Sequence, residues 1–376
     1  MPLESIGIFD ILHSIGGWKL KAIKIFDLLA GGCLARILPR KPPSSVFAQP
    51  FKRILVIRPG GIGDAIFVLP FLRVIEKENP GIIIDVLCEQ RNAQIFTSQK
   101  GICDGIFCYD RLSSFRGIWG RHYDVVVDTE QWHYLSALVC YGMAHDYSIG
   151  FASRPLRKKL FSMTVDYDLD AYEIENFKKL FLPVFPGTGR ITDIAHSFIL
   201  DETAQEWARK QVPDPFVTLF LGASIPLRRL SLNQSAEIMQ FAFSKNLSVV
   251  LLGGHDVIGE AGRITENIAD QRVINFVGKA SLLQTAALIK RSRFFVGPDS
   301  GIMHLARAVG TPVIAIFGPG NLQKWGLKGD RDRVVTLNLP CSPCTRFGYT
   351  IPTCRGTYKC MRDIKLGDID SLNDII

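Results

Sequence analysis

Residues 296–319, Val-Gly-Pro-Asp-Ser-Gly-Ile-Met-His-Leu-Ala-Arg-Ala-Val-Gly-Thr-Pro-Val-Ile-Ala-Ile-Phe-Gly-Pro, include a polar turn and a helical segment between two apolar runs. The runs, at 294–297 and 312–317, are typical of strands buried inside a parallel sheet. A helix is expected to begin near Ser300, so the turn should join the carboxyl end of a strand to the amino end of a helix. Units of this kind build doubly wound α/β sheets.

The turn in this stretch is a candidate binding site. Asp299, Ser300 and Gly301 occupy it. Unpaired backbone N–H groups and the helix dipole would favour an anion such as a phosphate at this position. His304 lies about one turn further along the helix and can face the same crevice. An ordinary crossover with a capped helix is the alternative interpretation.

A second segment repeats the pattern of strand, turn and helix. It spans residues 53–64, Arg-Ile-Leu-Val-Ile-Arg-Pro-Gly-Gly-Ile-Gly-Asp. Pro70 is expected near the first turn of the helix that follows. Glycines permit positive φ and a close approach of the backbone to a ligand, and this turn contains Gly60, Gly61 and Gly63.

Asp64 distinguishes this turn from a dinucleotide-binding loop. A G-x-G-x-x-G loop would need a third glycine where this chain has Ile66. A carboxylate aimed at a pyrophosphate would repel it, so Asp64 is expected to act as a base or to bind a hydroxyl. Capping of the helix by Asp64 is the alternative.

Together, these segments resemble glycosyltransferase family 9, the heptosyltransferases that add ADP-activated heptose to the lipopolysaccharide inner core. The resemblance covers roughly residues 52–365. It implies a GT-B fold, in which two Rossmann-like doubly wound domains face each other across a cleft. The donor would bind to the second domain and the acceptor to the first. The motifs that carry the resemblance are residues 57–64 with 69–70, 221–224, 252–256, 297–306 and 317–319.

The resemblance also implies an activity, namely inverting transfer of a sugar onto a lipopolysaccharide core or a related glycan. The family favours heptose from ADP-heptose as the donor. Its catalytic base matches Asp64, which would take the proton of the acceptor hydroxyl. Arg228 and Arg229 would hold the donor diphosphate. The family commonly has a Lys at the position of Arg228, followed by a Trp-Pro pair that is replaced here by Leu230-Ser231.

The other expected site residues divide between the two substrates. Either Asp256 or Glu260 would bind the ribose diol, and Asp128 follows an expected strand on the acceptor side, where a turn or a cap is the alternative. Donor binding is expected from Ser224, Asp256, Asp299, Ser300, Gly301 and His304. The expected acceptor loop residues are Gly60, Gly61, Gly63 and Asp128.

Two alternative functions remain open from the sequence. The chain could be a catalytically divergent protein that only binds a nucleotide sugar, or a family member that uses another NDP-sugar. A divergent member should have lost Asp64 or Asp299, and both are present. Glycosyl transfer by this mechanism needs no cofactor.

Composition limits the partners. The 376 residues suit two domains, and 47% apolar with 21% charged residues is typical of a globular protein. The net charge of +8 favours acidic partners, here a nucleotide sugar and a phosphorylated glycolipid acceptor. No nucleic acid is expected, because zinc-finger, RNA-recognition and dense Lys/Arg signatures are missing from the sequence. A transmembrane helix is not expected either.

Three regions are expected along the chain. Residues 1–50 form a basic amphipathic extension with a linker, residues 51–190 the acceptor-side domain, and residues 191–376 the nucleotide-sugar domain with a cysteine-containing tail. The expected strands are 53–58, 82–88 and 123–128 in the first domain, and 216–221, 247–252, 272–276, 294–297 and 312–317 in the second.

The amino-terminal extension has two interpretations. Its apolar residues recur at helical spacing, and six Lys or Arg residues lie among them against three acidic residues. It could be an anchor lying on an anionic membrane surface, which would make a cytoplasmic protein peripheral on the inner membrane. Alternatively, it could be a pair of helices packed on the catalytic body. The Pro-rich residues 41–50 are expected to be a linker.

Two further clusters also have more than one interpretation. Arg154, Arg157, Lys158 and Lys159 are expected to form a solvated face, or else to meet lipid phosphates. The tail has a C-x2-C-x9-C-x5-C pattern that is compatible with a structural zinc site, with reduced packed thiols and redox pairing as the alternatives. Its members are Cys341, Cys344, Cys354 and Cys360.

Overall fold

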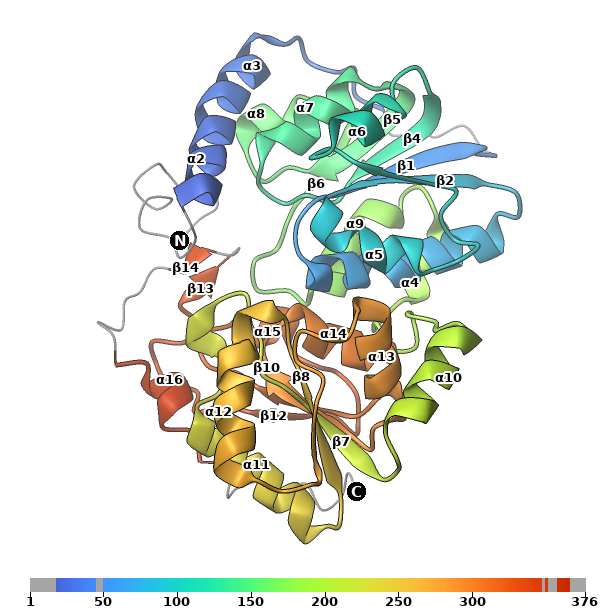
Figure 1. Cartoon of the computed structure of the whole chain (residues 1–376). Helices are drawn as coiled ribbons and strands as arrows, with labels where there is room; N and C mark the ends of the chain where they lie inside the picture. The colour runs from blue at the N-terminus through green and yellow to red at the C-terminus, as the bar shows by residue number, and fades with distance from the viewer. Residues whose placement is uncertain (1–17, 45–49, 347–348, 351–356, 366–376) are drawn as a thin grey trace. The chain divides into compact units, whose positions relative to one another are not determined.

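The computed structural model describes residues 18–44, 50–346, 349–350 and 357–365. The chain divides into two compact units, residues 1–193 (unit 1) and residues 194–376 (unit 2). Each unit contains a six-stranded sheet with helices around it (Figure 1).

Unit 1 has a wholly parallel sheet with the strand order β3-β2-β1-β4-β5-β6. Its strands are β1 Arg53–Arg58, β2 Ile83–Cys88, β3 Gly105–Cys108, β4 His122–Asp128, β5 Ala144–Phe151 and β6 Met163–Val165. Its helices are α2 Trp18–Phe26, η2 Asp27–Gly31, α3 Gly32–Ile37, α4 Ile62–Glu78, α5 Gln90–Thr97, α6 Leu112–Arg116, α7 Tyr134–Gly142, α8 Pro155–Lys158, α9 Glu173–Phe181 and η3 Pro186–Arg190.

Unit 2 repeats this plan with the strand order β12-β11-β10-β7-β8-β9, again parallel throughout. Its strands are β7 Phe216–Phe220, β8 Ser248–Leu252, β9 Val273–Asn275, β10 Phe295–Pro298, β11 Val313–Ile316 and β12 Arg333–Val335. A separate antiparallel pair joins β13 Thr345–Arg346 to β14 Tyr349–Thr350. Its helices are α10 Glu202–Gln211, η4 Pro226–Arg228, α11 Leu232–Ser244, η5 His255–Val257, α12 Ile258–Ile268, α13 Leu282–Arg291, α14 Gly301–Ala308, α15 Leu322–Trp325 and α16 Lys359–Arg362.

All eight strands expected from the apolar runs are present, and no strand end is shifted by more than one residue. The runs are visible in sequence because central strands are buried on both faces, as in β7, where every residue is buried. The other four strands of the two six-stranded sheets carried too little signal to be expected. β3, β6 and β12 are only three or four residues long, and the first half of β5 alternates between exposed and half-buried positions.

Strand order reverses once in each sheet, and this positions the candidate site. In unit 1 the reversal lies between β1 and β4, and in unit 2 between β7 and β10. The chain leaves neighbouring strands there in opposite directions, which opens a crevice beyond their carboxyl ends. Ligands of open α/β sheets bind at such a switch point.

One expectation about α4 was wrong. Pro70 lies in the middle of this helix rather than in its first turn. Pro70 has no backbone N–H to donate within the helix. Apolar burial stabilises the helix nevertheless, because every side chain from Ala65 to Leu72 is buried in unit 1. Gly63 is already the second helical residue, and among the three glycines only Gly60 has a positive φ, of 105°.

The amino-terminal segment packs on unit 1. α2, η2 and α3 run on without a break and lie beside α7 and α8 (Figure 1). Beyond α3, the backbone N–H groups of Lys41 and Ser44 donate to the carbonyls of Lys159 and Ser162, so this part of the expected linker is bound to the body. Across the described residues, none of the helices has the length and apolar character needed to span a membrane.

Candidate active site

The glycine turn after β1 places Asp64 at the switch point of unit 1. Gly61 is the N-cap of α4, and Asp64 is the third residue of the helix. The Asp64 carboxylate accepts a hydrogen bond from the Gly61 N–H, so Asp64 does cap the helix. A carboxylate can accept several hydrogen bonds, so its oxygens can still accept another from a ligand. A side chain at Gly60 would crowd this corner, because its Cβ would lie 3.2 Å from Arg58 Nη2 and 3.4 Å from Asp64 Oδ2.

The surroundings of Asp64 favour its protonated form. Burial raises the pKa of this carboxyl above its ordinary value, and the nearby Arg58 guanidinium opposes that rise. The carboxylates of Glu173 and Glu130 raise the pKa further. A carboxylate with a raised pKa is a stronger base than an ordinary aspartate, so this position suits proton abstraction.

Arg58 spans the switch point of unit 1. It is the last residue of β1, is almost wholly buried, and donates to the carbonyls of Pro59 and Thr129. Its Nη2 also lies 3.4 Å from Glu130 Oε2, in the loop after β4. Arg58 therefore ties the glycine turn to the neighbouring loop. It stands in the Arg-Pro-Gly-Gly motif, which was the only sequence signal for its role.

Asp128 is occupied by protein partners. Its carboxylate accepts from Arg157 Nη2 at 3.0 Å, Ser136 Oγ at 2.9 Å and the Glu130 N–H at 3.0 Å. The side chain is fully buried. The geometry therefore gives Asp128 a part in shaping the loop after β4.

The solvated-face interpretation of the basic cluster was wrong for two of its four members. Arg157 is fully buried because it pairs with Asp128. Arg154 is 5% exposed, and its guanidinium carbon lies 4.1 Å from the centre of the Trp132 ring and 5.0 Å from that of Tyr134. Arginine stacks on aromatic faces, which explains how both cations are accommodated inside the unit.

Asp27 of the amino-terminal segment caps α7 from a distance. The N-cap residue of α7, His133, provides no side-chain cap. Instead, the Asp27 carboxylate accepts from the Tyr134 N–H at 3.1 Å and the Leu135 N–H at 2.7 Å, and lies 3.2 Å from His133 Nδ1. Burial acts to raise the pKa of Asp27, but these contacts prevail and lower it. The extension thus holds the end of the loop that begins at Asp128.

In unit 2, an ion pair spans the equivalent switch point. Arg228, in the loop after β7, places Nη1 2.9 Å from Asp299 Oδ2, in the turn after β10. Asp299 is 4% exposed. Burial raises the pKa of this carboxyl, and Arg228 opposes that rise. Two residues that were expected to bind the donor are therefore brought together.

The turn after β10 leads directly into the amino end of α14. Ser300 is the N-cap of α14, and its Oγ accepts from the Met303 N–H. The first N–H groups of α14, including that of Gly301, point out of the helix end. His304 is buried beside Trp325, and burial, reinforced by Arg228, lowers its pKa to about 3. A neutral imidazole can donate one hydrogen bond.

The loop after β8 completes the row of expected donor residues. Arg229 forms ion pairs with Asp256 and with Glu260, the latter at 3.6 Å. Both candidates for the ribose diol therefore face the same cation. Ser224 lies exposed in the loop after β7. Because β8, β7 and β10 are neighbours in the sheet, their loops lie along one edge.

The tail cysteines approach one loop of unit 2. The Cys344 N–H donates to the Pro319 carbonyl at 3.1 Å. A Cβ on Gly318 would lie 3.2 Å from the Cys360 carbonyl oxygen, so both segments reach the same loop. Cys341 is exposed. Cys354 lies outside the described residues.

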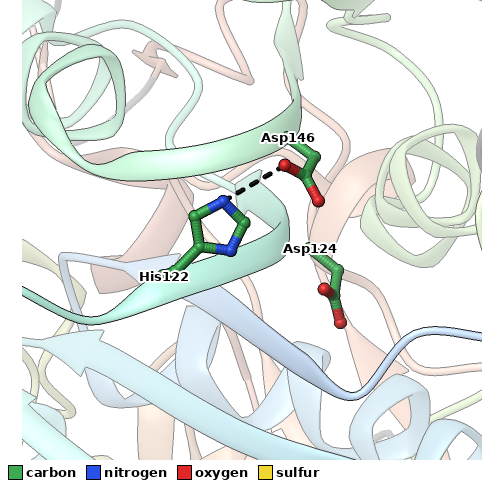
Figure 2. Close-up of side chains that lie close together, drawn as sticks. All are labelled: His122, Asp124 and Asp146. Carbon is green, nitrogen blue, oxygen red and sulfur yellow. Dashed lines mark ion pairs between the residues drawn. The ribbon is translucent and has the colours of Figure 1, made fainter.

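A further group of side chains with metal-ligand chemistry lies at the far edge of the unit 1 sheet. The ligand atoms of His122, Asp124 and Asp146 lie within 4.8 Å of one another (Figure 2). His122 Nε2 pairs with Asp146 Oδ1 at 3.1 Å, and Asp124 accepts from the Arg53 N–H. These residues stand near the starts of β4 and β5, so they are at the opposite edge from Asp64.

Known proteins match both the sequence and the fold. The family model described as glycosyltransferase family 9 (heptosyltransferase) matches residues 111–352, well over half of the chain. Lipopolysaccharide heptosyltransferase 1 of Pseudomonas aeruginosa is 23% identical over 324 residues, which cover 78% of this chain and 86% of that protein.

Solved structures give the fold. A family 9 glycosyl transferase from Veillonella parvula has a TM-score of 0.71 at 18% identity, covering 88% of this chain and 98% of that one. Escherichia coli heptosyltransferase WaaC with ADP has a TM-score of 0.64 at 19% identity, covering 75% and 92%. The iron-containing dodecameric glycosyltransferase TibC from enterotoxigenic E. coli has a TM-score of 0.55 at 14% identity, covering 88% and 77%.

The expected GT-B type of fold, with two Rossmann-like sheets, is thereby confirmed. The enzyme class implied by the sequence motifs is confirmed as well. With a family model matched over residues 111–352 and two parallel sheets like those of its solved members, the chain belongs to glycosyltransferase family 9.

Proposed function

We propose that this glycosyltransferase transfers a sugar, heptose from ADP-heptose, onto a lipopolysaccharide core or a related glycan with inversion at the anomeric carbon. The observation that carries the proposal is Asp64, a carboxylate with a raised pKa at the switch point of unit 1. Asp64 takes the proton of the acceptor hydroxyl while that oxygen attacks the anomeric carbon. The bond from that carbon to the diphosphate breaks, and ADP leaves with its electron pair.

Donor binding falls to the switch point of unit 2. Arg228 meets the diphosphate, since a guanidinium can hold phosphate oxygens bidentately. The N–H groups at the start of α14, beginning with Ser300 and Gly301, add neutral donors, and His304 supplies one more. Asp299 accepts from sugar or ribose hydroxyls.

The adenosine side of the donor is assigned to the loops after β7 and β8. Asp256 binds the ribose diol, with Arg229 holding that carboxylate in place, and Ser224 adds a hydroxyl. The relatives support adenine as the base of the nucleotide, because WaaC was solved with ADP and with an ADP-2-deoxy-2-fluoro heptose.

The acceptor is a phosphorylated glycolipid bound by unit 1. The backbone of Gly60 and Gly61, with Gly63 in the first turn of α4, allows close approach of an acceptor sugar to Asp64. Asp128 shapes the neighbouring loop through Arg157. This assignment follows the relatives, which include a lipopolysaccharide and a lipooligosaccharide heptosyltransferase. The enzyme would work at the cytoplasmic side of a membrane that holds the acceptor.

One experiment separates this function from its alternatives. The purified protein is incubated with radiolabelled ADP-heptose, or with UDP- and GDP-sugars, and with lipopolysaccharide truncated at the inner core. Transfer from ADP-heptose alone is expected. Transfer from another nucleotide sugar would assign a different donor, and nucleotide binding without transfer from any donor would indicate a catalytically divergent binding protein.

A structural metal at the tail is proposed separately from catalysis. Cys341 and Cys344 have the two-residue spacing of a metal-binding knuckle, and the segments of Cys344 and Cys360 reach the same loop. Cys354 would be the fourth ligand. Four thiolates suit zinc, and TibC, described as iron-containing, makes iron the second metal to test.

Elemental analysis tests this site. About one zinc or iron per chain is expected in the purified protein, with most of it lost in Cys344→Ser. Cys33→Ser, which changes an exposed cysteine on α3, is the matched control and should retain the metal. A metal-free protein whose melting temperature does not respond to a chelator would contradict the proposal.

A further inference from the structure

The amino-terminal segment has two faces of opposite character. One face turns inward: Lys24, Asp27, Gly31 and Ala35 recur at spacings of three or four residues and are all buried. The other face, called the outer face below, carries the large apolar side chains of Phe26, Leu29, Leu34 and Ile37. These side chains are 72%, 53%, 53% and 80% exposed.

The inner face fixes the segment on unit 1. Asp27 caps α7 through two backbone N–H groups, and the Lys159 ammonium donates to the Leu38 carbonyl at 2.7 Å. A Cβ on Gly31 would come within 2.8 Å of Tyr134 Cβ, so the segment and α7 are in close contact. The outer face is therefore held in a defined orientation rather than swinging on a linker.

Charge around the outer face has one sign. Residues 18–44 include six lysines and arginines, of which Lys24 is buried on the inner face, and one acidic residue, Asp27, whose carboxylate is turned inward. Arg36 and Arg40 are exposed beside Ile37. An exposed apolar stripe flanked by cations suits the boundary of an anionic lipid layer, where apolar side chains enter the acyl region and cations meet headgroup phosphates.

We propose that the outer face docks unit 1 onto an anionic lipid surface. The inference rests on the proposed function in one respect, because a glycolipid acceptor makes a membrane the expected workplace. The segment that touches lipid is also the one that caps α7, next to the loop beside Asp64. Docking would thus present the acceptor side of unit 1 to the membrane in a fixed orientation. Packing on the body and attachment to a membrane, which the sequence offered as alternatives, are both roles of this one segment.

The test uses the full chain, since deletion of the segment would also remove the cap of α7. Flotation is measured with vesicles of phosphatidylcholine alone and with vesicles containing about one-third phosphatidylglycerol, without donor or acceptor. Phe26→Ser/Ile37→Ser should lower the partition onto anionic vesicles at least about tenfold. Burial of each of these side chains in an apolar phase favours binding by roughly a factor of ten. Leu112→Ser/Leu182→Ser, at exposed apolar positions elsewhere in unit 1, is the matched control and should stay within about twofold.

A charge variant isolates the electrostatic part. Arg36→Gln/Arg40→Gln should weaken binding to anionic vesicles several-fold at low salt, where surface charges are little screened; at ~0.1 M salt they are screened over about 10 Å. The variant should have little effect on neutral vesicles, because these carry no net charge for the arginines to attract. Equal vesicle binding by the wild type and Phe26→Ser/Ile37→Ser would overturn the proposal. So would a dimer in analytical ultracentrifugation that this variant dissociates while vesicle binding is unchanged, since the outer face would then bind a second copy.

Failure of docking and failure of the proposed function are distinguishable. Transfer to a detergent-dispersed acceptor needs no vesicle, so docking is overturned alone if transfer proceeds and no form of the protein binds lipid. Vesicle binding that depends on the outer face, without transfer from any nucleotide sugar, would support docking and overturn the proposed function.

Discussion

The switch points of the two sheets are built alike, and they differ in which carboxylate the arginine neutralises. In unit 1, Arg58 reaches across from β1 to Glu130, and Asp64 stands beside the pair with a raised pKa. In unit 2, Arg228 reaches across to Asp299 itself, the carboxylate of the turn. One topology therefore yields a carboxylate suited to take a proton at one site. At the other it yields an arginine paired with the carboxylate of the turn, and we propose that this arginine meets the donor diphosphate.

The largest effect is expected from removal of the Arg228–Asp299 ion pair of unit 2. Arg228→Ala should destabilise unit 2 by about 3–5 kcal/mol, because it leaves Asp299 buried without its cation. ADP affinity should also fall. Urea unfolding and calorimetry measure the two effects. In Arg228→Ala/Asp299→Asn the buried charge is gone, so stability should largely return while ADP affinity stays low. Unchanged ADP affinity in both variants would assign the diphosphate to Arg229 or another cation.

The base of unit 1 is the next test. Asp64→Asn keeps the shape of the side chain but cannot accept the proton, so turnover should fall by about 10²-fold or more, close to 3 kcal/mol in activation free energy. ADP affinity, which we assign to unit 2, should be unchanged. Glu76→Gln, at an exposed position of the same helix, is the matched control. Turnover near the wild-type rate would remove Asp64 from the mechanism.

Acid should weaken unit 2 through His304. The pKa of this buried imidazole is lowered to about 3, so below an ordinary value of about 6.5 the unfolded chain takes up a proton that the folded chain does not. Stability is therefore lost as the pH falls from about 6.5 toward 3, by about 2 kcal/mol at pH 5. His304→Gln should remove this part of the loss, measured as unfolding free energy at pH 7 and pH 5. The exposed His255, changed to Gln, should leave the loss intact; equal losses in both variants would contradict the assignment.

Helix capping offers the mildest comparison. Unit 2 caps α13 locally with Ser281, whereas unit 1 caps α7 with Asp27, more than a hundred residues away. Asp27→Ala and Ser281→Ala should each cost about 1 kcal/mol of unfolding free energy, since both remove acceptors for helix N–H groups. If Asp27→Ala had no effect while Ser281→Ala did, the distant cap would contribute nothing to stability.

The features that could be predicted from the sequence are those that depend on short-range sequence patterns, namely the central strands and the turns. The central strands are apolar because both of their faces are buried, and the turns at Gly60 and Ser300 follow from short-range rules. Short edge strands such as β3 and β12 bury little and gave no such signal. Partners far apart in sequence could not be predicted either. Nothing in the spacing links Asp27 to α7 or Arg157 to Asp128. A run of basic residues such as 154–159 is expected to be exposed to solvent unless the carboxylate and the aromatic rings that contact it are known.

The distant cap also has a consequence for synthesis. Asp27 leaves the ribosome 107 residues before Tyr134, and the Asp27 carboxylate accepts a hydrogen bond from the Tyr134 N–H. At about 5–20 residues per second, the segment therefore waits roughly 5–20 s for the helix that it caps. The outer face does not pack on α7 and is exposed before and after that helix forms, so the docking proposed above would allow the segment to meet lipid before unit 1 is complete. The order of events in the cell would then be attachment first and completion of unit 1 second.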